Sequence, residues 1–166
     1  AAARGEKLLV FSCYVRFLDL LQPMLARHGH ACCRVDGSQG AEERDTQVMR
    51  FHEPGVPVLL MSLKCGVGLN LTCASTVVMC EPWWNPFAED QACDRVHRIG
   101  QQKAVRVLRL AVADTVEDRI MQLQQQKREV AGRILGDDAR SQGDSAAERA
   151  AAGRLSESDL AQLFGF

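Results

Sequence analysis

The chain has 166 residues, of which 46% are apolar and 25% are charged, and its 20 Lys and Arg against 21 Asp and Glu leave a formal net charge of −1. These proportions are typical of a globular domain and exclude a collagen-like, largely disordered or strongly basic protein. No apolar run reaches the roughly 18 residues that a membrane-spanning helix needs, and no signal-peptide pattern opens the chain. We therefore expect no membrane partner.

Seven cysteines are present, an odd number, and no two of them are spaced as C-x-x-C. Neither a secreted disulfide framework nor a zinc site is expected, and the four histidines show no metal-ligand spacing. We predict no metal site, and we interpret the cysteines as reduced thiols that pack like small apolar side chains in an intracellular protein. Because the chain begins with three alanines and no Met, we expect it to be a piece of a longer protein.

Strand-like and helix-like segments alternate along the chain. Short apolar runs predict strands over residues 7–12, 31–35, 56–61, 76–80 and 105–112. Apolar residues at helical spacing predict helices over residues 17–29, 41–52 and 115–134, and Asn85 followed by Pro86 predicts a helix start between them. Because continuously apolar strands that alternate with helices indicate a parallel sheet covered on both faces, we predict one doubly wound α/β domain over residues 5–135.

The apolar residues that recur at helical spacing in the first helix are Phe17, Leu18, Leu20, Leu21, Met24 and Leu25. In the second helix the spacing places Val48, Met49 and Phe51 on the inner face. Residues 136–154 are rich in Ala, Gly, Ser and Asp and predict a flexible linker. Residues 155–166 predict a short docking helix behind the cap Ser156, with Leu160, Leu163 and Phe164 as its docking residues.

Residues that carry chemistry concentrate between positions 62 and 102. We predict that Gln91, Arg95 and Arg98 share one face of the third helix, at i, i+4 and i+7. Such a face binds an anion, because Arg is permanently charged and its planar fork pairs with phosphate oxygens. The alternative is a solvated helix on which Asp94 and Arg98 form an ion pair.

A glycine-containing loop, SLKCGVGLNLT (62–72), follows a predicted buried strand. Its G-x-G step at 66–68 is not a nicotinamide-dinucleotide fingerprint, because Leu71 occupies the third glycine position and no acidic residue ends the next strand. We interpret the loop as one that brings backbone N–H groups and Asn70 or Thr72 toward a nucleotide or a DNA phosphate.

Two adjacent tryptophans, Trp83 and Trp84, lie between prolines at the carboxyl end of a predicted strand, where open α/β sheets bind ligands. At least one of them is expected in the core, and the other is available to a base or sugar. Basic residues accumulate just beyond, between Arg95 and Arg109. This accumulation fits a polyanion contact, or a basic edge strand protected against aggregation.

The sequence contains no G-x-x-x-x-G-K-[ST] motif and no strand that ends in a paired-acid magnesium motif. The chain therefore does not hold a triphosphate and its metal in the usual P-loop manner. Arginines that can pair with phosphate, in a chain without a P-loop, indicate one half of a composite site that a facing domain completes.

Together these motifs resemble the C-terminal helicase lobe of a Swi/Snf-type DNA-dependent ATPase, within helicase superfamily two. The similarity covers roughly residues 5–135 and the terminal tail. The matching segments are LVFSCY (motif IV), RVDGS with Arg44 and Phe51, SLKCGVGLNLT (motif V) and QACDRVHRIGQ (motif VI). PWWNP and the ending DLAQLFGF are most similar to the branch that contains helicase-like transcription factor, transcription termination factor and post-replication repair translocases.

The resemblance implies a RecA-like lobe that closes on an N-terminal RecA-like lobe of the same polypeptide. That missing lobe would hold most of the ATP and Mg²⁺, and double-stranded DNA or nucleosomes would lie across both lobes. The implied catalytic residues are Arg95 and Arg98, and the implied ATP-binding residues are Gln91, Gly66, Gly68 and Asn70. The implied DNA-binding residues are Trp84, Thr72, Lys64, Asp36, Gly37 and Ser38. The implied function is ATP-driven DNA translocation in chromatin remodelling or DNA repair, in the nucleus.

The sequence departs from this branch at two places. Motif V is one residue shorter than the usual S-L-K-[AC]-G-[GS]-V-G-L-N-L-T pattern, and Glu81 replaces the usual Asp before PWWNP. Because a shorter loop re-aims its N–H groups, the alternative function is a non-catalytic remnant or interaction module that keeps the fold. One half of an RNA helicase is a further alternative, which the PWWNP and HRIGQ segments disfavour.

Overall fold

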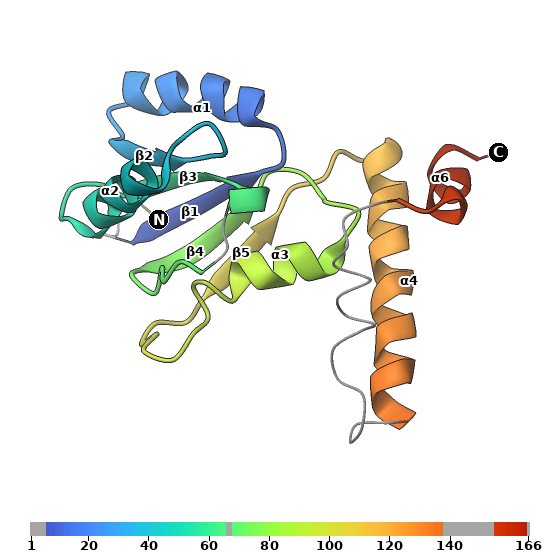
Figure 1. Cartoon of the computed structure of the whole chain (residues 1–166). Helices are drawn as coiled ribbons and strands as arrows, with labels where there is room; N and C mark the ends of the chain where they lie inside the picture. The colour runs from blue at the N-terminus through green and yellow to red at the C-terminus, as the bar shows by residue number, and fades with distance from the viewer. Residues whose placement is uncertain (1–5, 66–67, 138–154, 166) are drawn as a thin grey trace. The chain divides into compact units, whose positions relative to one another are not determined.

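The structure, a computed structural model, describes residues 6–65, 68–137 and 155–165. Its sheet has five parallel strands in the order β2-β3-β1-β4-β5 (Figure 1). The strands are β1 (Lys7–Ser12), β2 (Cys32–Val35), β3 (Val58–Ser62), β4 (Ala74–Met79) and β5 (Arg106–Arg109). The helices are α1 (Val15–Arg27), α2 (Ala41–His52), the short 3₁₀ turn η2 (Leu63–Cys65), α3 (Pro86–Cys93), α4 (Val116–Asp137) and α6 (Glu157–Phe164). The predicted parallel α/β sheet is confirmed.

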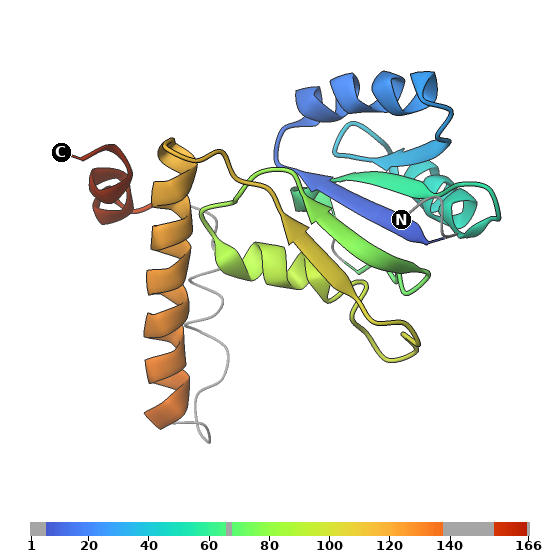
Figure 2. The same ribbon diagram turned by 180° about the vertical axis from the view of Figure 1, so that it is seen from behind.

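The strand order decides which face of the sheet each helix covers. The connection from β1 to β2 runs in one direction across the sheet, and the connections from β2 to β3 and from β4 to β5 run in the other. Because such connections are right-handed, two helices whose connections run in opposite directions lie on opposite faces of the sheet. Accordingly, α1 packs on one face, while α2 and the last turn of α3 pack on the other (Figures 1 and 2). This is the doubly wound arrangement that the sequence predicts.

The face under α2 carries the larger core. Alternate strand residues such as Leu9, Phe11 and Met61 point toward it, and Phe51 of α2 is fully buried among them. The expectation that Met49 is also buried is wrong, because it is 64% exposed. Two residues along an α-helix correspond to a rotation of about 200°, so Met49 and Phe51 point in nearly opposite directions.

The opposite face carries a smaller core around α1, in which Leu18 is fully buried. Leu21 and Leu25 complete the buried stripe of the helix. The neighbouring positions Phe17, Leu20 and Met24 are exposed. A helix on a sheet buries one stripe, and the sequence pattern of α1 is wider than that stripe.

The described structure consists of two compact units. Unit 1 comprises Ala1–Glu81 and Gln91–Leu110, and unit 2 comprises Pro82–Asp90 and Ala111–Phe166. The predicted domain ranges, 5–135, 136–154 and 155–166, follow a different division and stay a prediction. Helix α4 extends to Asp137, and residues 138–154 of the predicted linker lie outside the described residues.

Unit 2 has a small core of its own, made by Trp84, Leu123 and Leu163. Helix α6 begins with a capping box: Ser156 Oγ accepts from the N–H of Asp159 at 3.1 Å, and the Asp159 carboxylate accepts from the N–H of Ser156 at 2.9 Å. The predicted cap and the docking of Leu163 are confirmed. Phe164 is 60% exposed and therefore less buried than Leu163.

The sequence predicts no disulfide framework, no metal site and no membrane-spanning helix, and the described residues can be compared with each expectation. None of the seven cysteines, all of which lie in the described ranges, forms a disulfide. Burial, with a contribution from Glu81, raises the pKa of the Cys80 thiol to about 11. Among the described residues, no His, Cys, Asp and Glu gather into a group of three or more that could hold a metal. Within the same residues, no helix has the length and apolar content to cross a bilayer.

We expect Leu18→Ala to lower the free energy of unfolding by about 2–5 kcal/mol, because it removes a fully buried side chain from a closely packed core. Leu20→Ala on the same helix is the matched control, and it should change stability by less than about 0.5 kcal/mol because Leu20 is 72% exposed. Urea unfolding followed by circular dichroism measures both. Equal effects of the two substitutions would contradict the assigned face of α1.

Candidate functional site

The return segment connects the carboxyl end of β3 to the amino end of β4, and the structure describes its residues 63–65 and 68–73. Because the two strands are parallel, the segment has to run back along the length of a strand, roughly 17–20 Å. It does so on the α2 face, where Leu63, Leu69 and Leu71 pack against the core. Lys64 therefore lies near the carboxyl ends of the strands, and Thr72 lies near their amino ends.

The second half of the return segment is attached to the turn after α3. The N–H of Leu71 donates to the carbonyl of Arg95 at 3.0 Å, and the Asn70 side chain accepts from the N–H of Thr72 at 3.4 Å. Gly68 has a φ of +85°, which side chains of L-residues rarely adopt. The structure thus brings Asn70, Thr72 and Arg95 together. Gly66, predicted to belong to the same site, lies outside the described residues.

Arg95 and Arg98 lie in the turn that follows α3 and not on the helix itself. Helix α3 ends at Cys93, and the chain continues in a series of hydrogen-bonded turns. The prediction that Gln91, Arg95 and Arg98 share one helical face is therefore wrong. The reason is tertiary: the carbonyl of Arg95 is bonded to the return segment and Val96 is fully buried. These contacts override the helical continuation that the sequence suggested, and they remove the basis for an i, i+4 ion pair as well.

Arg95 is half-buried, and its Nε is enclosed without a hydrogen-bond acceptor among the described residues. Enclosing an N–H group without an acceptor costs about 1–3 kcal/mol. The position therefore favours an acceptor oxygen supplied by a ligand. Gln91 and Arg98 are exposed and accessible from solvent.

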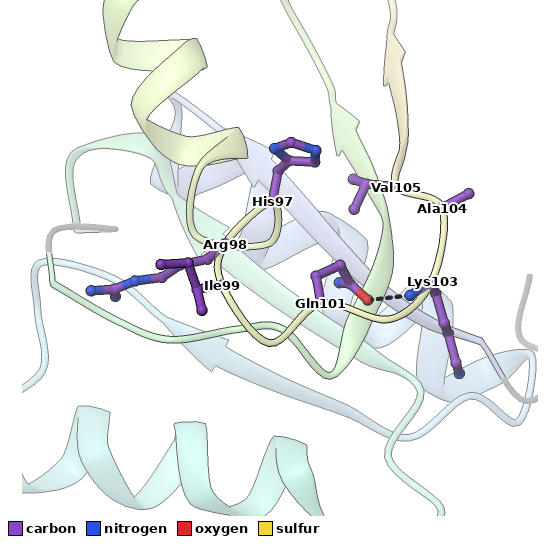
Figure 3. A pocket seen from close by; sticks show the side chains of 7 residues that line it. All are labelled: His97, Arg98, Ile99, Gln101, Lys103, Ala104 and Val105. Carbon is purple, nitrogen blue, oxygen red and sulfur yellow. Dashed lines mark hydrogen bonds between the residues drawn. The ribbon is translucent and has the colours of Figure 1, made fainter.

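Residues 94–100, which follow α3 and carry Arg95 and Arg98, are called the arginine-bearing turn. An open hollow of about 410 Å³ lies beside this turn (Figure 3). It is lined by His97, Arg98, Ile99, Gln101, Lys103, Ala104 and Val105. Figure 3 shows Gln101 inside the turn, between His97 and Lys103. Because its charged lining is basic and contains no acidic side chain, the hollow has the electrostatic character of an anion-facing surface.

At the carboxyl ends of the strands, Asp36 builds a turn. Its carboxylate accepts from the N–H of Ser38 at 2.8 Å, from the Ser38 hydroxyl at 2.6 Å and from Arg34 Nε at 2.6 Å. Burial by itself would raise the pKa of Asp36, but the Ser38 hydrogen bonds and the Arg34 charge outweigh it and hold the pKa below its usual value. The DNA contact implied for Asp36 stays a prediction, and in this structure the carboxylate is buried and bonded to Arg34 and Ser38.

Gly37, Ser38 and Lys64 are exposed at this same edge of the sheet. A Cβ on Gly37 would lie 3.8 Å from the Sγ of Cys65. The turn after β2 and the start of the return segment are therefore neighbours. Four of the predicted DNA-binding residues, Asp36 included, share this edge, whereas Thr72 lies at the opposite one.

Glu81 ties together the carboxyl ends of β1 and β4. Its Oε1 accepts from Ser12 Oγ at 2.8 Å and also from the N–H of Cys13. Glu81 therefore bonds the ends of two neighbouring strands. The branch that this sequence resembles usually has the shorter Asp at this position.

Trp84 is 8% exposed and lies in the core of unit 2, against Leu123 and Leu163. The Lys127 ammonium lies 4.5 Å from the centroid of its ring. The DNA contact implied for Trp84 stays a prediction, and in this structure its ring is enclosed among the side chains of unit 2. The expectation that at least one of the two tryptophans belongs to a core is confirmed by this residue.

Sequence reasoning missed two polar residues that hold these loops. Glu89 is 1% exposed and accepts from the N–H of Trp83 at 2.8 Å and from Gln124 Nε2 at 2.6 Å, all within unit 2. Gln101, in unit 1, bonds several backbone groups of the arginine-bearing turn and the return segment. No local sequence signal identifies Glu89, whose partner Gln124 lies 35 positions away, whereas Gln101 is the last residue of the motif VI segment QACDRVHRIGQ.

The comparison with protein families identifies the class. The family model described as "Helicase conserved C-terminal domain" matches residues 1–100, which is more than half of the chain. The chain therefore belongs to the helicase conserved C-terminal domain family. Within helicase superfamily two it is of the Swi/Snf type, which confirms the resemblance drawn from its motifs.

Curated relatives point to the same group. The chain is 48% identical over 140 residues to DNA repair protein RAD5B of Arabidopsis thaliana, covering 82% of this chain and 11% of that protein. It is 42% identical over 160 residues to helicase-like transcription factor CHR27 of Arabidopsis thaliana, covering 95% and 14%. It is 42% identical over 135 residues to DNA repair protein rad8 of Schizosaccharomyces pombe, covering 80% and 12%. The chain thus spans 11–14% of the length of these relatives.

A solved structure supports the fold. The crystal structure of the C-terminal part of the Fun30 ATPase domain is similar with a TM-score of 0.71 and 34% identity, covering 74% of this chain and 40% of that chain. The RecA-like helicase-lobe architecture is therefore confirmed.

We expect acid to reduce the stability of unit 1 partly through Asp36. A carboxyl whose pKa is lowered in the folded state stabilises the fold above its unfolded pKa of ~3.9. This stabilisation is lost as the pH falls below that value and through the lowered folded pKa. Asp36→Asn should therefore be less stable near neutral pH and lose less stability than wild type between about pH 5 and 3.

Urea unfolding at several pH values measures this difference, and Asp45→Asn, at an exposed position of α2, is the control. An acid dependence of Asp36→Asn that equals that of wild type would contradict the assigned role of Asp36.

We expect Trp83→Phe, which leaves Trp84 as the chain's sole tryptophan, to show fluorescence that is weakly quenched by iodide and insensitive to added duplex DNA. The physical reason is that Trp84 is enclosed in the core of unit 2. The reciprocal variant Trp84→Phe reports on half-buried Trp83 for comparison. Strong quenching of Trp84, or protection of Trp84 by DNA, would support the DNA contact that the resemblance implies.

Proposed function

We propose that this chain is the C-terminal half of an ATP-dependent double-stranded DNA translocase. In this proposal the chain supplies Arg95 and Arg98 to an ATP site that is shared with an N-terminal RecA-like lobe of the same polypeptide. That lobe holds most of the nucleotide and its Mg²⁺. The reaction is hydrolysis of the β–γ phosphate bond, and the arginines stabilise the charge that develops on the phosphoryl oxygens.

The observation that carries the proposal is the enclosed Nε of Arg95. This donor lacks an acceptor among the described residues, and a phosphate oxygen is the acceptor that an Arg fork pairs with best. ATP is the ligand that helicase relatives imply, so the residues fit the group. Gln91 and Arg98 add a further amide and a further cation that are open to solvent.

The return segment is the proposed link between nucleotide and DNA. Gly68 and Asn70 belong to the nucleotide side of the proposal, together with Gly66. The hydrogen bond between Leu71 and Arg95 attaches this part of the segment directly to the arginine-bearing turn. Movement of either piece is therefore transmitted to the other.

For DNA binding we propose Lys64, Gly37 and Ser38 at the carboxyl edge of the sheet, and Thr72 at the other end of the return segment. The Lys64 ammonium and the Gly37 N–H are suitable donors to phosphate oxygens, whereas the N–H and the hydroxyl of Ser38 already donate to Asp36. Asp36 acts indirectly, since it shapes the turn that carries Gly37 and Ser38.

The proposed partners are double-stranded DNA or nucleosomes, in the nucleus. Several relatives are named as DNA repair proteins or helicase-like transcription factors, which supports a role in repair or chromatin remodelling. The second candidate is a non-catalytic module that keeps the fold, and the motif V segment that is one residue shorter than the usual pattern favours it.

One experiment decides between the two candidates. ATP hydrolysis is measured with and without duplex DNA, first for this chain alone and then for the chain joined to the N-terminal lobe of its polypeptide. Activity only in the joined protein, increased by DNA, is the expected result. A folded joined protein without activity under both conditions would establish the non-catalytic candidate.

In the joined protein, we expect Arg98→Ala to lower DNA-stimulated turnover by about 10³-fold, because it removes a cation from the transition state. Arg27→Ala, at an exposed position in the last turn of α1, is the matched control and should retain wild-type turnover. Circular dichroism shows whether both variants remain folded. Turnover of Arg98→Ala close to wild type would remove Arg98 from the catalytic machinery.

A further inference from the structure

Gln101 lies where three stretches of backbone in unit 1 converge. Its Nε2 donates to the carbonyls of Ala74 at 2.8 Å, Thr72 at 3.1 Å and Val96 at 3.2 Å. Its Oε1 accepts from the N–H of Lys103 at 2.9 Å (Figure 3). One side chain therefore bonds the end of the return segment, the arginine-bearing turn and the approach to β5.

A side-chain amide suits this set of partners. Its two N–H groups are shared among the three carbonyls, and its oxygen accepts from the N–H of Lys103. Glu has the same shape and would keep the acceptor, but it would place a carboxylate against three carbonyl oxygens. The contact pattern also fixes which end of the amide is nitrogen, because three carbonyls surround it.

The backbone next to Gln101 is shaped for this insertion. Gly100 has a φ of +103°, a conformation that is open to Gly and strained for other residues. The N–H of Gln101 then donates to the carbonyl of Arg98 at 3.0 Å. The turn therefore folds back on itself, and the Gln101 side chain enters the space between the turn and the return segment.

We infer that Gln101 is a positioning residue, which fixes the turn that carries Arg95 and Arg98 to the segment that carries Asn70 and Thr72. The hydrogen bond from Leu71 to Arg95 is a second attachment between the same two pieces. With both attachments in place the two pieces move as one body. The coupling concerns the structure of unit 1, and its effect on turnover rests on the function proposed above.

The first test needs no ATPase activity. Backbone amide hydrogen exchange is measured by NMR on this chain for Gln101→Glu and for the matched control Gln102→Glu, which changes the adjacent exposed residue in the same way. We expect the Leu71 amide of Gln101→Glu to exchange at least about tenfold faster than in wild type, because its acceptor turn is released. The Lys103 amide should stay protected, since Glu still accepts from it. Gln102→Glu should match wild type.

The second test uses the joined two-lobed protein. We expect Gln101→Glu to lower kcat by about 10-fold or more while KM for ATP changes less than about threefold, because a misplaced arginine acts mainly on the transition state. Gln102→Glu should leave both constants unchanged. If Gln101→Glu does not fold, Gln101→Asn keeps the amide with a shorter reach and should show the same pattern with smaller changes.

The outcomes separate the two proposals. Wild-type exchange at Leu71 in a folded Gln101 variant would overturn the coupling, whatever the turnover. Faster exchange with an unchanged kcat would overturn the positioning role and leave the proposed function standing. A wild-type joined protein without activity would defeat the proposed function, and the exchange of the Leu71 amide would still decide the coupling.

Discussion

Every strand of a parallel sheet has to be entered from the same edge, and this constraint organises most of what unit 1 does. Between β3 and β4 the chain meets it with a largely irregular segment, the return segment, so most of its backbone groups have no helical partner. They are satisfied by other means: Leu71 donates to Arg95, and the carbonyl of Thr72 accepts from Gln101. The arginine-bearing turn is thus held in place by the same bonds that make the return possible. The same hydrogen bonds therefore satisfy the return segment and position the candidate site.

Unit 2 uses the same principle in its own loop. The backbone at Trp83 is irregular, and side chains provide its partners: the buried carboxylate of Glu89 accepts from its N–H, and Gln124 of α4 donates to its carbonyl. Buried polar groups of this kind are costly unless they are fully bonded. They therefore specify one arrangement of the loop, and that arrangement encloses Trp84 among the leucines of the unit.

The sequence was sufficient where a local signal decides the outcome. The buried strands follow from continuous apolar runs, the start of α3 from Asn85 before Pro86, and the start of α6 from Ser156. The sequence was insufficient where residues far away in the chain determine the local structure. The end of α3 depends on Val96 and on a bond to the return segment, and the burial of Trp84 depends on α4 and α6. Neither partner can be read from neighbouring residues, and the same holds for the backbone groups that Gln101 bonds.

Strand β5 is an edge of the described sheet, and its sequence, RVLR, begins and ends with arginine. An open edge offers unpaired backbone groups to any other strand, including the same strand of a second molecule. Two β5 edges that approach each other would bring arginines against arginines, so the repulsion between them opposes self-association. This protection is electrostatic, and at high ionic strength the Debye length shrinks to about 3 Å at 1 M salt. Added salt therefore weakens this protection of the β5 edge.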